Sequence, residues 1–236
     1  MTELLTPPEW AALALSLKVS LWATLGSLLP GIAIAWVLAR RRFVGHGLLN
    51  AVVHLPLVLP PVVIGYGLLV LFGRGGFIGG WLYDVFGVTL VFTWKAAALA
   101  AAVMAFPLMV RAMRLSLEAV DRGLEDAART LGASPVRVFF TITLPLMLPG
   151  VVTGCVLAFA RALGEFGATI TFAANIPGQT RTLPLALYTL TQSPGGEAAA
   201  ARLAVLAVVV AVAALMASEL LARRIQLRAS GGAHDK

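Results

Sequence analysis

Five long apolar stretches constrain what this chain can fold into. They cover about residues 11–38, 48–72, 88–110, 144–163 and 203–222, and each contains at most one charged residue. The hydrocarbon core of a bilayer is about 30 Å thick, so a helix of about 20 residues crosses it with its backbone groups hydrogen-bonded. We therefore predict an all-α polytopic membrane protein with about five transmembrane helices.

The composition supports this prediction and excludes other classes of protein. Of the 236 residues, 59% are hydrophobic and 12% are charged, whereas soluble domains average about 45–50% apolar and about 25% charged residues. This balance excludes a soluble enzyme and a disordered protein. The single cysteine, Cys155, excludes a disulfide framework. The three histidines are scattered, so we expect no metal site in this chain.

A sixth apolar segment, residues 166–193, has a different character from the five stretches. It contains Pro177, Pro184, Gly167 and Gly178. Proline and glycine inside a helix remove a hydrogen bond or add backbone freedom, so they break or weaken long helices. We therefore predict re-entrant or short-helix structure here instead of another full span.

The distribution of lysine and arginine predicts the orientation of the chain. Twelve of the 18 basic residues follow the first, third or fifth stretch, and three lie in the loops on the opposite side. Cytoplasmic loops carry an excess of basic residues. We therefore predict that residues 1–10 lie outside the cell membrane and that the tail, residues 223–236, is cytoplasmic. Because topology accounts for most of the net charge of +7, we expect no nucleic-acid partner.

The predicted cytoplasmic loop, residues 112–143, changes from an apolar to an amphipathic pattern. Apolar side chains recur at steps of three and four residues, and charged side chains occupy the opposite face, which predicts a helix over residues 118–131. At about 1.5 Å per residue this helix is too short to cross a membrane. Gly132 is typical of a helix stop, and Ser134 followed by Pro135 predicts a second short helix. This pattern alone fits a docking element and a helix lying on its own membrane domain equally well.

The motif in this loop resembles the EAA loop of ABC-importer permeases. An acidic residue, two alanines and a glycine are followed at a fixed distance by Ile142, Leu144 and Pro145. Asp126 stands where that family has glutamate. The resemblance implies a coupling helix that enters a cleft of a partner ATPase, formed by Glu125, Asp126, Ala127, Ala128, Leu131 and Gly132.

Residues 54–63, 106–111 and 158–169 extend the resemblance to permease subunits of molybdate ABC importers. Sulfate and tungstate permeases share parts of these motifs, so both remain alternative substrates. The resemblance implies a type I ABC-importer permease domain over residues 11–222 in the bacterial inner membrane, with the N-terminus periplasmic. It implies a homodimer of permease subunits, two ABC ATPase subunits and a periplasmic molybdate-binding protein, with import by alternating access.

The resemblance also implies that ATP is used by the partner ATPase and that this chain binds no cofactor. The glycine-rich run at residues 73–80 lacks the Lys-Ser/Thr ending of a phosphate-binding loop. A secondary transporter is a weaker alternative, because inverted repeats and acidic residues on several spans are not seen. An intramembrane enzyme would need a nucleophile with a base or a metal cluster, and neither pattern is present.

Two groups of residues inside the stretches are candidates for the translocation path or its gate. The second stretch contains Pro56, Pro60, Pro61 and Gly65, and the fourth ends near Arg161 and Glu165. Freed backbone groups at membrane depth are tolerated where they line a cavity, but proline and glycine also produce ordinary kinks and close helix packing. Arg161 and Glu165, four residues apart, fit a gate or a structural ion pair.

Overall fold

The computed structural model describes residues 5–231, and within this range the chain forms helices and loops without a strand. The side chains of residue 215 and residues 217–231 are not described. The helices are α1 (Pro7–Arg40), α2 (His46–Val58), α3 (Pro61–Phe72), α4 (Phe77–Phe86), α5 (Trp94–Glu118), α6 (Arg122–Thr130), α7 (Pro135–Val138), the π-helical turn η1 (Phe139–Thr143), α8 (Leu144–Leu163), α9 (Gly167–Phe172), α10 (Leu183–Thr191) and α11 (Glu197–Gly231).

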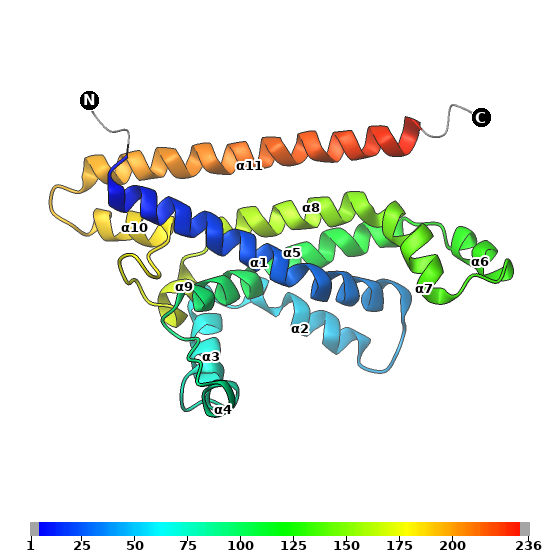
Figure 1. Ribbon diagram of the computed structural model, residues 1–236, viewed down its shortest axis with the longest axis horizontal. Coiled ribbons are helices and arrows are strands. Elements are labelled where there is room, and N and C mark those ends of the chain that lie inside the picture. The colour runs from blue at the N-terminus through cyan, green and yellow to red at the C-terminus, as the bar shows by residue number, and fades with distance from the viewer. Residues whose placement is uncertain (1–4, 232–236) are drawn as a thin grey trace.

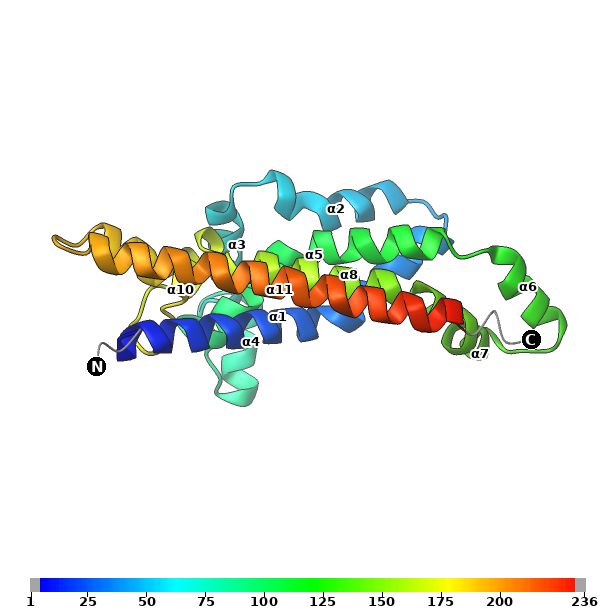
Figure 2. The same ribbon diagram turned by 90° about the horizontal axis from the view of Figure 1, so that it is seen from above.

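Four long helices, α1, α5, α8 and α11, run along the same axis (Figures 1 and 2). Within the described residues, four helical segments are long and apolar enough to cross a membrane, and the bent pair α2–α3 brings the number to five when it is taken as one span. This agrees with the prediction of about five spans. The helices α6 and α7 lie at the end of the bundle where α1 and α11 finish.

Helix α5 occupies the centre of the bundle and packs against α1 and α8. Its buried face carries Ala97, Ala100 and Ala101 at one end and Met109 and Met113 at the other. Small side chains allow helix backbones to approach closely in a membrane. The alanine-rich sequence of residues 96–105 is therefore the reason that α5 can be surrounded by other helices.

The second predicted span, residues 48–72, is not one straight helix. It breaks after Val58, and α2 and α3 are inclined by 115°. Pro60 and Pro61 lie at this break; each lacks an N–H group, and a proline also disfavours helical geometry in the preceding residue. Figure 1 shows that α3 and α4 consequently stand away from the long axis of the bundle.

Three other predicted boundaries differ from the structure. The third span begins at Trp94 rather than residue 88, because Phe92 has a positive φ of 61° and Thr93 caps the helix that follows. Helix α1 already begins at Pro7, inside the predicted external segment 1–10. Helix α11 continues through the predicted tail as far as Gly231, while residues 1–4 and 232–236 lie outside the described part.

The segment 166–193 contains the two short helices α9 and α10, as predicted. Neither is long enough to span a bilayer. The hydroxyl of Ser16 on α1 accepts a hydrogen bond of 2.6 Å from the backbone N–H of Leu183, which holds the start of α10 against the bundle.

Candidate coupling site and translocation path

The cytoplasmic loop predicted from the EAA-like motif folds as a helical hairpin at one end of the molecule (Figure 1). The prediction of one helix over residues 118–131 is wrong, because α5 extends to Glu118 and α6 begins only at Arg122. Asp121 separates them: its carboxylate accepts a hydrogen bond of 2.8 Å from the N–H of Gly123. Aspartate at this position satisfies an otherwise free helix N–H, so it favours a new helix start.

The turn after α6 has the predicted chemistry. Gly132 has a φ of 84°, and the N–H of Ala133 donates to the carbonyl of Ala128 at 3.0 Å, which closes the end of the helix. The hydroxyl of Ser134 accepts a hydrogen bond from the N–H of Arg137 and caps α7, which begins at Pro135. Both the glycine stop and the second short helix are therefore confirmed.

The outer surface of this hairpin presents apolar side chains. Leu131, in the turn after α6, is 89% exposed, and Leu124, Ala127 and Val136 are exposed as well. Asp126 and Arg129, on the same helix, form an exposed ion pair of 2.6 Å. Exposed apolar groups that are rimmed by charges are typical of a surface that binds another protein.

Glu125 differs from the other predicted coupling residues because it faces the interior of its own chain. It is 5% exposed, whereas Asp126, Ala127, Leu131 and Gly132 are exposed and Ala128 is half-buried. Its carboxylate accepts hydrogen bonds from Arg40 on α1 at 3.1 Å and from Thr143 on η1 at 2.7 Å. The helical periodicity of the sequence placed Glu125 on the charged face of the helix. Nothing in that pattern predicted that Thr143 would contact it.

Four of the predicted path or gate residues meet where α3, α8 and α9 join. Arg161 and Glu165 form an ion pair of 2.6 Å, and the buried Glu165 also accepts a hydrogen bond of 2.8 Å from the N–H of Ala168 on α9. A Cβ atom on Gly65 of α3 would lie 2.6 Å from the carbonyl oxygen of Ala168, and one on Gly167 would lie 2.7 Å from the Cβ of Pro61. Close packing is therefore the observed role of Gly65, while Pro60 lies at the α2–α3 break.

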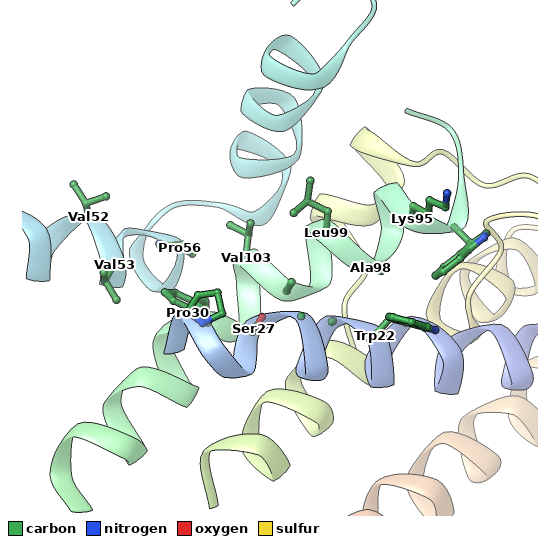
Figure 3. A pocket seen from close by; sticks show the side chains of 15 residues that line it. Trp22, Ser27, Pro30, Val52, Val53, Pro56, Lys95, Ala98, Leu99 and Val103 are labelled. Carbon is green, nitrogen blue, oxygen red and sulfur yellow. The ribbon is translucent and has the colours of Figure 1, made fainter. Parts of the chain in front are cut away.

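Pro56 lies in a different place, in an apolar groove between α1, α2 and α5. Figure 3 shows Pro56 near Pro30 of α1, with Lys95 and Trp22 towards the other end of the groove. The groove has a volume of about 840 Å³, and its lining is almost entirely apolar. The structure therefore separates the predicted path residues into a groove that contains Pro56 and a packed junction that contains Pro61, Gly65, Arg161 and Glu165.

Residues 31–227 match the family described as the inner membrane component of binding-protein-dependent transport systems. The chain belongs to this family. The matched range includes the hairpin α6–α7 and both groups of candidate path residues. This membership favours the ABC-permease interpretation over the alternative of a secondary transporter.

Relatives within the family extend over nearly the whole chain. The chain is 64% identical over 226 residues to the molybdenum transport system permease protein ModB of Escherichia coli K12, covering 96% of this chain and 99% of the relative. It is 57% identical over 224 residues to the ModB protein of Haemophilus influenzae, with coverage of 95% and 98%.

A solved structure with low sequence identity shares the fold. A bacterial alginate ABC transporter, crystallised in complex with a periplasmic protein bound to an alginate pentasaccharide, contains a chain with a TM-score of 0.73. The sequence identity is 16%, and the comparison covers 93% of this chain and 80% of the other. The predicted fold class, that of an ABC-importer permease, is confirmed by this likeness.

Proposed function

We propose that this chain is the permease subunit of a bacterial ABC importer that moves molybdate across the inner membrane. The observation that carries the proposal is the identity of 64% over 96% of the chain to a molybdenum transport permease. The exposed apolar tip around Leu131 supports it, because a permease needs a surface on which a separate energy-supplying subunit can act. In this proposal ATP is bound and hydrolysed by that partner, and the chain itself holds no cofactor.

The assembly we propose contains two copies of this permease, two ABC ATPase subunits and a periplasmic molybdate-binding protein. The N-terminus is periplasmic and the C-terminus cytoplasmic. The arrangement of the helices supports this orientation, because the hairpin α6–α7 and the C-terminal ends of α1 and α11 lie at one end of the bundle (Figure 1). The three arginines at residues 40–42 and five more at residues 111–137 belong to this end.

The mechanism we propose is alternating access. The tip of the hairpin, with Asp126, Ala127 and Ala128 of α6 and Leu131 and Gly132 of the turn that follows, enters a cleft of the ATPase. Closure of the two ATPases on ATP draws the two hairpins together. The long helices then move as rigid bodies between an inward-open and an outward-open state. The groove that contains Pro56 and the junction that contains Glu165 are the regions where we expect the path and its gate.

Reconstitution tests this function directly. The permease, its ATPase and its binding protein are inserted in proteoliposomes, and uptake of labelled molybdate is measured with tungstate and sulfate as competitors. We expect uptake that requires ATP and all three components and that excess sulfate does not abolish. Uptake that prefers sulfate or tungstate would contradict the substrate, and accumulation by this chain alone would contradict its role as a subunit.

A further inference from the structure

The attachment of the coupling helix to the rest of the chain depends on very few groups. Within the described residues, α6 packs mainly against its neighbours α7 and η1. Two arginine side chains make hydrogen bonds between α6 and α1. Arg40 donates to the carboxylate of Glu125 at 3.1 Å, and Arg122 donates to the carbonyl of Ala39 at 3.3 Å.

Glu125 is the point at which these attachments converge. Its Oε1 atom accepts from Arg40, at the C-terminal end of α1, and from the hydroxyl of Thr143, the last residue of η1 before α8 begins. Arg40 also donates to the carbonyl of Val120, in the break between α5 and α6, at 3.3 Å. The carboxylate of Glu125 therefore contacts Arg40, the last residue of α1, and Thr143, the residue before α8.

Burial makes this connection stiff. Thr143 and the side chains of Arg40 and Glu125 are all at least nine-tenths buried, and Arg129 adds a second cation 3.8 Å from the Oε2 atom of Glu125. A buried carboxylate that loses its partners is left without compensating hydrogen bonds, which costs free energy, so the arrangement resists separation. By contrast, the outer residues of α6 are exposed and free to contact another protein.

We propose that Glu125 is a positioning residue that ties the coupling helix to α1 and α8, so that movement of α6 is transmitted to both long helices. This inference rests on the proposed function, because it requires an ATPase that displaces α6. The ATPase acts on the outer face of α6, and Glu125 holds the inner face. When the hydrogen bonds of Glu125 are removed, α6 can still move with the ATPase, but its movement is no longer transmitted to α1 and α8.

The first test compares import with ATP hydrolysis in the reconstituted complex. In Glu125→Gln the side chain keeps its shape but loses its charge, and in Thr143→Val only the connection to α8 is lost. We expect the molybdate imported per ATP hydrolysed to fall about tenfold in both variants, while ATP hydrolysis stays within about twofold of the parent. Thr143→Ser keeps the donor, so we expect it to recover most of the ratio that Thr143→Val loses.

Glu118→Gln is the matched control. Glu118 pairs with Arg114 at 2.7 Å near the end of α5, but its side chain is 41% exposed. We expect the amount of molybdate imported per ATP hydrolysed by Glu118→Gln to equal that of the parent. An unchanged ratio in Glu125→Gln and Thr143→Val, a parallel loss of hydrolysis and import, or loss of assembly in both variants would overturn the role of Glu125.

A second measurement tests the tie whatever the substrate is. Hydrogen exchange of the purified complex is followed with and without ATP. We expect ATP to change exchange in α6, the end of α1 and the start of α8 in the parent, and in α6 alone in Thr143→Val. The same response in parent and variant would overturn the inference. A parent complex that shows these changes but imports no molybdate would instead contradict only the proposed substrate.

Discussion

At the scale of single residues, the tip of the coupling hairpin depends on Ala128 and Gly132. Gly132 has a φ of 84°, a conformation that costs most side chains about 1–2 kcal/mol. Space is not the constraint, because an added Cβ atom would meet nothing within 4 Å. The backbone turn is therefore what fixes the direction in which the apolar tip points.

We predict that Ala128→Asp and Gly132→Asp leave the chain inserted in the membrane but reduce transport to background. Each places a charge on the surface that we propose to contact the ATPase, and Gly132→Asp also adds a side chain where the backbone turns. Membrane fractionation measures insertion, and uptake in proteoliposomes measures transport. A variant that transports at the parent rate would contradict the assignment of this loop.

The same residues show which parts of the site were predictable. Gly132 and Ser134 act through backbone groups three to five residues away, so their roles could be predicted from the local sequence. Glu125 acts through Arg40, which is 85 residues distant. Periodicity describes only which face of a helix a residue occupies, and it therefore grouped Glu125 with the solvent-exposed charges.

At the scale of elements, α3 and α9 are joined by contacts that leave no room for a side chain. Gly65 approaches the backbone of Ala168, which cannot move aside as a flexible side chain could. The sequence contained both the glycine and the Pro60-Pro61 break, but it could not predict the bend of 115°. The position of α3 depends on where α9 lies, and α9 is about 100 residues further along the chain.

We predict that Gly65→Ala lowers the free energy of unfolding by about 1–3 kcal/mol, the usual cost of overpacking. Gly67→Ala is the control on the same helix, because its Cβ atom would meet nothing within 4 Å. There the loss of glycine flexibility is expected to be neutral or to stabilise the helix by up to about 1 kcal/mol. Thermal unfolding of the detergent-solubilised complex distinguishes the two variants. Equal shifts of the unfolding temperature in Gly65→Ala and Gly67→Ala would contradict the packing argument.

At the scale of the whole molecule, the number of spans and the fold class were predictable because hydropathy adds up over long segments. The separation of α3 and α4 from the bundle axis was not predictable in this way. Their exposed side chains, which include Tyr66, Phe77 and Trp81, are as apolar as those of a buried core. A pattern of hydropathy does not distinguish a helix that contacts its own chain from one that contacts lipid or a second subunit.

The orientation of the whole chain leads to a prediction on intact cells. Cys155 is replaced by serine, and a single cysteine is introduced at an exposed position as Arg42→Cys, between α1 and α2, or Ser193→Cys, between α10 and α11. These two connections lie at opposite ends of the bundle (Figure 1). We expect a membrane-impermeant thiol reagent to label Ser193→Cys directly and Arg42→Cys only after the membrane is permeabilised. The reverse pattern would contradict a periplasmic N-terminus.

The buried carboxylate of Glu125 has a consequence for anyone who builds chimeras of such permeases. A hairpin transplanted from another transporter brings its own ATPase-binding surface, but it meets the recipient's Arg40 and Thr143. If the donor hairpin lacks an acid at the matching position, the recipient is left with a buried guanidinium that has no counter-charge. Exchange of ATPase specificity therefore requires these two distant positions to be grafted together with the loop.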